Sequence, residues 1–369
     1  MKSPEFASRI NGLDTLRSCA ILLVLMYHYK VFVSGQASFG LLSEIGWIGV
    51  DLFFVLSGYL IGNQIFSAMK KETGFSLPTF YARRALRTLP NFYVVLAIYL
   101  LFPVESGGKA LTPLWKFLTF TQNFDLKPGT AFSHAWSLCI EEQFYLALPL
   151  LAIVCVHSLK SYRLMWAVVI AAMGVAALTR LWMWQSIGEN MGAYYSHIYY
   201  SSWCRFDELL PGVALALLKN FHADWWRRLT RYGHVSLIGG SLLTAFAIYL
   251  FAVHHFVEGV GFNPWVTSVG YTVLSGGFAL LCLSALSPTS YLSRWRIPGA
   301  ASLALWSYAL YLIHKPLMNM LKSLFIAHAW DLNGTVVIAI MFSSSTVAAY
   351  VMFKVVETPF MRLRARYFS

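Results

Sequence analysis

Long apolar stretches recur along nearly the whole chain, and short polar loops separate them. A helix needs roughly 20 apolar residues to cross a bilayer, and a spanning segment must satisfy its backbone polar groups internally, which favours helices. The pattern therefore predicts an all-α fold, a polytopic membrane helix bundle that forms one domain over residues 1–369. About ten transmembrane helices are expected, at residues 14–33, 45–66, 88–104, 136–156, 163–184, 203–218, 234–254, 265–286, 301–325 and 334–355.

The composition points to the same class of protein. Hydrophobic residues make up 58% of the chain and charged residues only 12%, whereas a soluble domain carries about 25% charged residues. The polar surface is too small to cover the molecule in water, so we expect a multi-pass protein of the plasma (inner) membrane, in contact with membrane lipids. Residues 1–17 lack the small-residue cleavage site of a removable signal peptide. The first predicted helix is therefore expected to stay attached.

The positions of lysine and arginine predict the orientation in the membrane. Most of the 28 lie before the first helix, up to Arg17, or in every second loop after it, whereas the intervening loops hold only Lys109, Lys116 and Lys127. Because cytoplasmic loops accumulate these residues, both termini are expected to be cytoplasmic. The net charge of +12 is then explained by topology and by attraction to anionic lipids, and no nucleic-acid partner is expected.

The five cysteines all fall within predicted spans, and none has the paired spacing of a zinc site or a redox motif. We interpret them as small core residues and expect no metal and no disulfide framework. The chain also shows no internal repeat of the kind from which many transporters are built.

His28 lies deep inside the first apolar stretch, with Arg17 further toward its beginning. An ionisable side chain at membrane depth is costly and commonly marks a pathway or an active site. The first helix is expected to run outward, so at 1.5 Å per residue His28 lies in the outer half of the bilayer. Asp51, near the beginning of the second helix, is expected in the same layer.

Other predicted helices bring ionisable or polar groups to this layer. They are Glu141 and Glu142 of the fourth helix, Arg205, Asp207 and Glu208 of the sixth, and Tyr311 and His314 of the ninth. Each has a structural alternative, because a histidine can bridge two helices by hydrogen bonds and buried charges need partners for stability alone. The number of helices that contribute favours a functional site.

A second cluster lies in the predicted cytoplasmic loop before the third helix. Arg83, Arg84 and Arg87 are spaced i, i+4 and i, i+3, so they share part of one helical face. Guanidinium groups bind phosphates with two parallel hydrogen bonds, which favours docking of a phosphorylated cosubstrate. The alternative is a positively charged anchor at the membrane surface.

Seven motifs follow one another along the chain. The first four are R-x10-H from Arg17 to His28, GWIGVDLFFVLSGY at 46–59, RALRTLP at 84–90 and WSLCIEEQFYLALP at 136–149. The others are RFDELLPGVALA at 205–216, SYALYLIHKPL at 307–317 and VETPF at 356–360. Together they resemble the acyltransferase 3 family of integral-membrane acyltransferases, from Arg9 to about Phe360. Some members carry an additional carboxyl-terminal esterase-like domain, which we do not expect in this chain.

The resemblance implies an O-acyltransferase that moves an acyl group, usually acetyl, from cytoplasmic acyl-coenzyme A to a hydroxyl of a saccharide or lipid-linked glycan. The family's essential histidine matches His28, its partner arginine matches Arg17, and its RxxR element matches Arg84 and Arg87. Residue chemistry suggests compatible roles, because imidazole is a natural general base for a hydroxyl and a carboxylate such as Asp51 can orient it.

These roles give one set of candidate site residues. We expect catalysis by His28, Asp51, Glu141 and Glu142, acyl-coenzyme A binding by Arg17, Arg83, Arg84 and Arg87, and substrate binding by Arg205, Asp207, Tyr311 and His314. The pantetheine arm of the donor would extend from the cytoplasmic side through the bundle to His28. Whether His28 acts as a base or as a nucleophile that carries the acyl group stays open at this point.

The main alternative function is a glycan transporter or flippase without acyl transfer. Such a protein would use aromatic side chains, including Trp182, Trp184, Trp203, Tyr194, Tyr195, Tyr199 and Tyr200, to stack on sugars. These aromatics are also typical of the belt at a membrane interface. We expect loops 105–135 and 185–203 to contact the acceptor, whose identity no motif in the chain encodes.

Overall fold

The computed structural model describes residues 10–71, 74–107 and 112–368. Arg9 and Lys109, which entered the sequence analysis, lie outside the described residues. Within these ranges the chain is predominantly helical, with one two-stranded antiparallel sheet. The all-α prediction is confirmed.

The long helices are α1 (Asn11–His28), α3 (Ile48–Met69), α4 (Leu77–Leu101), α6 (Trp136–Ala152), α7 (Tyr162–Trp184), α10 (Leu210–Phe221), α12 (Gly233–Tyr249), α13 (Pro264–Leu286), α15 (Ala300–Ala327), α16 (Thr335–Met352) and α17 (Thr358–Tyr367). The shorter helices are α2 (Leu41–Ile45), α5 (Leu114–Leu118), α8 (Met191–Tyr194), α9 (Ser202–Arg205), α11 (Ala223–Arg231) and α14 (Tyr291–Arg294). The strands are β1 (Phe256–Val257) and β2 (Gly261–Phe262).

Short turns of other helix types extend several helices. The π-helical turns are η2 (Tyr29–Ser34), η4 (Ile153–Ser158), η5 (Tyr195–Tyr199), η7 (Leu250–His254) and η8 (Phe353–Glu357), and the 3₁₀ turns are η3 (Ser133–Ala135) and η6 (Phe206–Leu209). The turn η2 begins directly after His28, the last residue of α1. π-Helical turns in helices often occur at functional sites.

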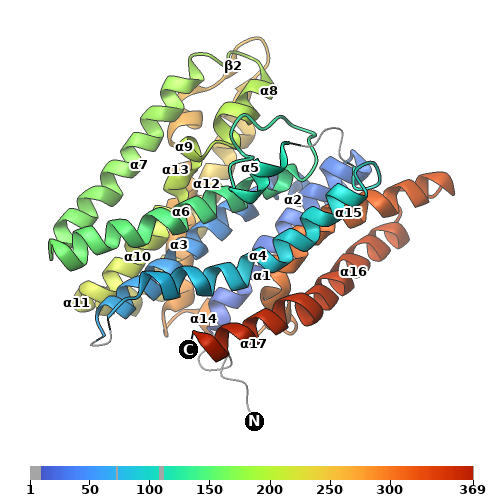
Figure 1. Cartoon of the computed structure of the whole chain (residues 1–369). Coiled ribbons are helices and arrows are strands. Elements are labelled where there is room, and N and C mark those ends of the chain that lie inside the picture. Colours follow the sequence, from blue (N-terminus) through green and yellow to red (C-terminus); the bar gives the residue numbers. More distant parts are fainter. Residues whose placement is uncertain (1–9, 72–73, 108–111, 369) are drawn as a thin grey trace.

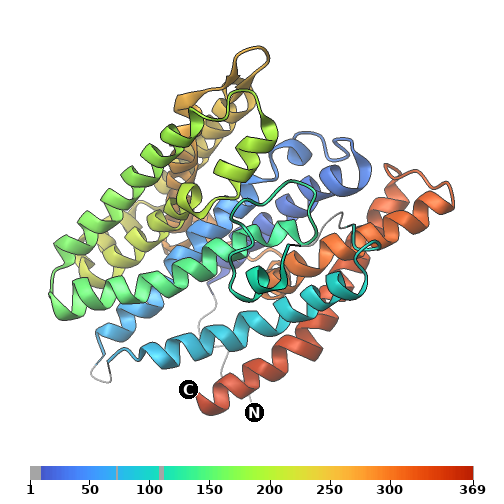
Figure 2. The same cartoon turned by 45° about the horizontal axis from the view of Figure 1, so that its top comes forward.

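The long helices form one bundle with two distinct ends. Helices α14 and α17 lie at one end, and α8 and the β1–β2 hairpin lie at the opposite end (Figure 1). Helices α4 and α17 contact each other and run side by side, as both views show (Figures 1 and 2). Helix α1 packs against α3, α13 and α15, so the helix that carries His28 is central to the bundle.

Seven helical segments within the described residues are long and apolar enough to cross a membrane. The seven segments start at α1, α3, η3, α7, α12, α13 and α16, and the one that starts at η3 continues through α6. With the outward-facing apolar side chains of α7, α12 and α16, they indicate a multi-pass integral membrane protein. The predicted spans at 88–104, 203–218 and 301–325 are helical but do not belong to these seven. The count of ten and the cytoplasmic termini stay predictions.

Two of these three spans differ from their predicted form. Helix α4 begins at Leu77 because the hydroxyl of Ser76 accepts a hydrogen bond from the backbone N–H of Thr79, and Pro78 suits a first turn. Arg83, Arg84 and Arg87, which were expected in a loop, therefore lie in a helix. The predicted span 203–218 is interrupted, because η6 separates α9 from α10.

Helices α3 and α10 approach each other through glycine. A Cβ atom at Gly58 would overlap the backbone of Leu209, and one at Gly212 would overlap the backbone of Val55. Small residues allow such close packing in membranes, where hydrophobic burial provides little attraction between helices. This contact places the break between α9 and α10 directly beside α3, the helix that carries Asp51.

Candidate active site

A pair of buried histidines joins α1 to α15. Nδ1 of His28 lies 2.7 Å from Nε2 of His314, and the two rings stack with centroids 5.0 Å apart and planes 9° apart. Both side chains are buried. The fold thus brings together two residues that lie 286 positions apart in the chain.

The hydrogen bonds of His314 define the tautomers of the pair. Nδ1 of His314 lies 2.9 Å from the carbonyl oxygen of Leu310, and a carbonyl only accepts, so this nitrogen carries the proton. In a neutral ring Nε2 of His314 then accepts, and Nδ1–H of His28 donates to it. The lone pair of His28 is left on Nε2, which has no hydrogen-bond partner among the described residues. The pair presents a general base.

A third histidine, His134, completes the cluster. Its ring meets those of His28 and His314 edge-on, with centroids 6.2 and 5.3 Å away. Nε2 of His134 lies 3.1 Å from the carbonyl oxygen of Leu312, and its buried Nδ1 has no partner. The sequence analysis missed His134 because it precedes the predicted fourth span by two residues. Its position beside an apolar run was the available signal.

Lys315 adds a positive charge beside the histidines. Its ammonium donates to the hydroxyl of Ser133 at 2.8 Å and lies 4.4 Å from the centre of the Phe32 ring. The side chain is buried, and no carboxylate of the described residues lies within ion-pair distance of it. Buried lysines are rarely left without an acidic partner, so this residue is a second one that the sequence analysis missed.

Substitution of His314 tests the tautomer assignment. His314→Phe removes the acceptor for Nδ1–H of His28 and is expected to lower acyl transfer about 10²-fold, because an unoriented base loses most of its effect. His314→Gln offers an amide oxygen as acceptor and is expected to recover at least tenfold of that loss. Initial rates in membranes, normalised to the amount of inserted protein, measure both. Equal activity of the two variants would contradict the assignment.

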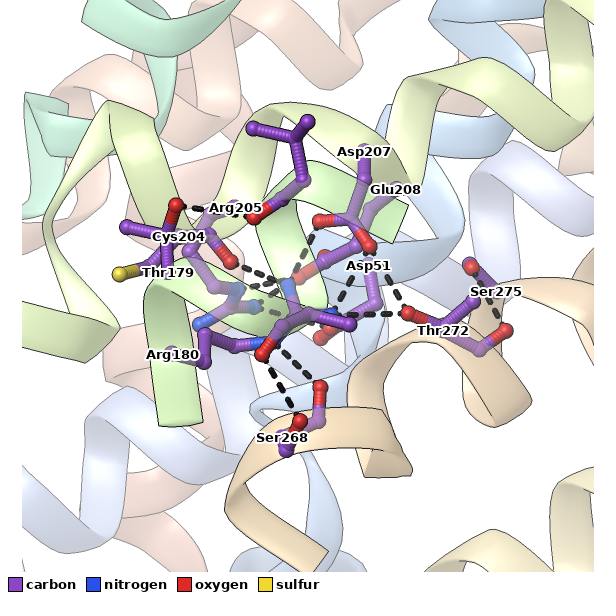
Figure 3. Close-up of polar contacts among 12 residues, drawn as sticks. Asp51, Thr179, Arg180, Cys204, Arg205, Asp207, Glu208, Ser268, Thr272 and Ser275 are labelled. Atoms are coloured by element: carbon purple, nitrogen blue, oxygen red, sulfur yellow. Dashed lines mark hydrogen bonds and ion pairs between the residues drawn. The ribbon is translucent and has the colours of Figure 1, made fainter. Parts of the chain in front are cut away.

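Asp51 does not orient His28, contrary to the expectation from the sequence. Its carboxylate instead accepts a hydrogen bond from Arg205 at 2.9 Å, and the same guanidinium binds Glu208. All three side chains are fully buried, and they lie close to one another in Figure 3. Membrane depth alone had suggested the pairing, but depth does not specify which side of a helix a residue occupies. The orienting partner of His28 is His314.

Arg205 and Asp207 each form ion pairs with other buried residues. Arg180 of α7 binds Asp207 at 2.7 and 3.0 Å, and Asp207 also accepts from Thr272 at 2.8 Å (Figure 3). Arg205 lies over the Tyr271 ring at 3.9 Å. These paired side chains connect α3, α7, α9, η6 and α13, so the geometry favours a structural role over the substrate binding predicted for Arg205 and Asp207. The sequence analysis did not single out Arg180.

A cavity of about 60 Å³, the arginine cavity, lies nearer to the end of the bundle that holds α17 than to the opposite end. Four helices line it through Arg17, Ser57, Glu141, Tyr308 and Tyr311, among others. Glu141 accepts a hydrogen bond from Ser57 at 2.8 Å, whereas the buried Nε of Arg17 has no partner among the described residues. The cavity thus offers a free cationic donor to a ligand atom.

Tyr311 connects this cavity to the histidines. Its hydroxyl bonds the hydroxyl of Ser137 at 2.7 Å and donates to the carbonyl oxygen of His134 at 2.5 Å. Two residues predicted to bind substrate, Tyr311 and His314, therefore lie near His28, on the same helix α15. The single layer predicted from the sequence is instead divided into the histidine cluster, the arginine cavity and the Arg205 network.

The three arginines of α4 have different surroundings. Arg83 donates to the backbone carbonyl of Phe368. Arg84 lies 3.7 Å from Glu142 and 4.1 Å from the centre of the Tyr145 ring, with its buried Nε unpartnered. Arg87 lies within electrostatic range of Arg17. The predicted phosphate-binding face is therefore divided, because the three arginines have different partners and Glu142 serves as the counter-ion of Arg84.

Comparison with known proteins assigns the family. A family model described as an acyltransferase domain, acyltransferase 3, matches residues 10–354. The chain belongs to the acyltransferase 3 family. The match includes every residue of the histidine cluster and of the arginine cavity, so this acyltransferase 3 chain places its site entirely within the family's domain.

Three relatives show where this acyltransferase 3 chain lies within the family. It is 27% identical to the peptidoglycan O-acetyltransferase OatA of Listeria monocytogenes and 29% identical to the putative peptidoglycan O-acetyltransferase YrhL of Bacillus subtilis, in each case over 84% of this chain. It is 26% identical to a putative O-acetyltransferase of Staphylococcus aureus over 95% of its length. The matches cover 50%, 48% and 57% of these proteins, so the chain spans about half the length of the relatives it matches.

Proposed function

We propose that this chain is an integral-membrane O-acetyltransferase that moves an acetyl group from acyl-coenzyme A to a hydroxyl of a saccharide. The observation that carries the proposal is the pair of His28 and His314, whose hydrogen bonds leave a lone pair on Nε2 of His28. The family and the names of the O-acetyltransferase relatives support the reaction class.

In the proposed reaction Nε2 of His28 accepts the proton of the acceptor hydroxyl as its oxygen attacks the carbonyl carbon of the thioester. The imidazolium of His28 is stabilised by the hydrogen bond from its Nδ1 to His314. When the carbon–sulfur bond breaks, the proton passes from Nε2 to the leaving thiolate. The ammonium of Lys315, held by Ser133, favours the negative charge that develops on the carbonyl oxygen.

The donor is proposed to approach from the end of the bundle that holds α17, which the arginine and lysine pattern predicts to be cytoplasmic. Arg84 and Arg87 would bind its phosphates, and the unpartnered Nε of Arg17 would donate to a carbonyl of the pantetheine arm in the cavity. Tyr311 and Ser137 extend the polar path from there to His134. This proposal needs a rearrangement of the cavity, which holds only about 60 Å³.

The arginines on α4 provide a test of donor binding. Arg84→Ala and Arg87→Ala are each expected to weaken acetyl-coenzyme A binding 10- to 100-fold, because a charge-assisted hydrogen bond contributes roughly 1.5–3 kcal/mol. Arg83→Ala is expected to change it less, since Arg83 binds the carbonyl of Phe368. Isothermal titration of purified protein measures the dissociation constants, with Arg294→Ala, an exposed arginine bound to the Pro288 carbonyl, as control.

The same titration separates this function from the main alternative. A glycan transporter without acyl transfer has no use for coenzyme A, so the absence of binding by native protein would contradict the proposal. Binding that is equally strong in Arg84→Ala and in the control variant would contradict the donor site. It would not contradict the reaction, which is tested separately.

The function itself is tested on the cell envelope. Cells that carry the gene are expected to contain envelope glycans with added acetyl mass, which alkali removes because the linkage is an ester. Loss of the gene should remove that mass, and native protein but not His28→Ala should restore it. Mass analysis of isolated glycans reports both the added group and the sugar that bears it. Identical glycans in all strains would contradict the proposal.

A further inference from the structure

A second, larger cavity lies at the end of the bundle that holds α8 and the β1–β2 hairpin. Its volume is about 380 Å³, within the range of small-molecule pockets, roughly 300–1,000 Å³. The wall is largely aromatic and includes Tyr27, Trp47, Tyr194, Phe251, His255 and Tyr271, from six different elements or connections of the fold. Loop 185–203, which was expected to contact the acceptor, contributes Tyr194 and Tyr195 to this wall, whereas the proposed reaction does not use the cavity.

The cavity has polar groups at defined positions among its rings. Nε2 of His255 is buried and has no hydrogen-bond partner, which is rare for a buried polar atom in a folded protein. Burial lowers the pKa of His255 to about 4, so the ring is neutral at physiological pH and suited to a hydroxyl group. Glu44 also lines the cavity and forms an ion pair with Lys30, where both side chains are partly exposed.

The wall combines buried rings with partly exposed ones, and Trp47 is among the partly exposed rings. Tyr194 and Tyr271 are buried and bond each other through their hydroxyl groups. Trp47 is only partly buried, and its ring is supported edge-on by Phe251, with centroids 4.9 Å apart. A rigid, supported and partly exposed indole is a surface on which the apolar face of a sugar ring can stack.

The cavity is adjacent to the proposed base. Tyr27 lines it, and the ring centroid of Tyr27 lies 5.8 Å from that of His28, the next residue of α1. The arginine cavity takes Arg17 from α1, whereas the aromatic cavity takes Tyr27, further along the same helix. At 1.5 Å per residue these positions are about 15 Å apart along the axis, so a ligand in the aromatic cavity would approach from a different end of the bundle than the donor.

We propose that this cavity is the acceptor site and binds a saccharide ring, with Trp47 as its stacking surface and Nε2 of His255 as a hydrogen-bond partner of a sugar hydroxyl. The assignment rests on the proposed function and adds the place and the residues of acceptor recognition. A lipid acyl chain fits the apolar rings, but it would leave Nε2 of His255 without a partner. A polyhydroxylated ring provides a hydroxyl for this nitrogen.

Binding of a defined disaccharide tests the site without catalysis. The protein is placed in lipid nanodiscs, which avoids sugar-headed detergents, and N,N′-diacetylchitobiose is titrated by calorimetry. Trp47→Ala is expected to raise its dissociation constant at least about tenfold, and Trp47→Phe less, because a smaller ring still stacks. Trp265→Ala, which removes an exposed tryptophan near the same hairpin, is expected to have no effect.

His255 is tested by the same titration. His255→Phe keeps an aromatic side chain but removes the ring nitrogens. It is therefore expected to raise the dissociation constant of the disaccharide about 5-fold, while the melting temperature stays near that of native protein.

The outcomes separate the acceptor site from the reaction. An unchanged dissociation constant in Trp47→Ala, or binding of decanoate in place of the disaccharide, would overturn the site. Acetyl transfer with an unchanged acceptor KM in Trp47→Ala would overturn the site while the enzyme assignment stands. If disaccharide binding depends on Trp47 but the protein transfers no acetyl group, the saccharide site is supported and the proposed acetyltransferase function is contradicted.

Discussion

Replacement of His28 by alanine is expected to lower acyl transfer at least about 10³-fold while the protein is inserted and folded as before. A general base contributes roughly 10²–10⁴-fold to a reaction of this kind, and here its loss also leaves Nε2 of His314 without a donor. The measurement is the initial rate of acetyl transfer in isolated membranes, normalised to the amount of protein and accompanied by its melting temperature.

A matched variant controls for the loss of an imidazole ring. His328 is exposed and bonds only the carbonyl of Leu324 in its own helix, so His328→Ala is expected to keep native activity. Turnover of His28→Ala within a few-fold of native would contradict the role of His28. A loss of activity that accompanies a lower melting temperature in both variants would show an effect on folding and not on chemistry.

Replacement of Arg205 by methionine is expected to give the largest loss of stability in the bundle. The guanidinium of Arg205 is the counter-ion of both Asp51 and Glu208, and all three side chains are fully buried. Removal of one member of a buried ion pair leaves an uncompensated charge and costs about 3–5 kcal/mol. Denaturant titration of the purified protein, followed by circular dichroism, measures the change in the free energy of unfolding.

An exposed pair supplies the comparison for Arg205. Arg227 and Asp224 form an ion pair at 2.5 Å with side chains that are 76% and 79% exposed, so Arg227→Met is expected to change stability by less than about 1 kcal/mol. Equal effects of Arg205→Met and Arg227→Met would contradict the structural role of the network. Asp51→Asn is expected to lose stability but to keep the rate per folded molecule, which distinguishes this role from the catalytic one predicted from the sequence.

The sequence predicted the long central helices well because their apolar runs are continuous. The first two spans, expected at 14–33 and 45–66, correspond to Asn11–Ser34 and Ile48–Met69 in the structure. The predicted helix bounds are less accurate where charged and apolar residues alternate. The early beginning of α4 depends on the cap at Ser76, and the break at η6 depends on buried charges that hydropathy does not describe.

Only part of the candidate site could be predicted from the sequence, and the histidines show why. Hydropathy and orientation give the depth of His28, but its partner depends on which helix packs against α1 and on the rotation of both helices. Helix α15 packs there, so the partner is His314 and not Asp51. His134 and Lys315 were not predicted, because their contacts in the cluster join segments that lie far apart in the chain.

The most direct test of the central claim follows one acetyl group across the membrane. Native protein is reconstituted in liposomes of known orientation, with labelled acetyl-coenzyme A only on the side of α17 and the saccharide N,N′-diacetylchitobiose only on the other side. The account predicts an alkali-labile labelled acetyl ester on that saccharide with native protein and none with His28→Ala. Label that stays on coenzyme A, or equal esterification by both proteins, would contradict it.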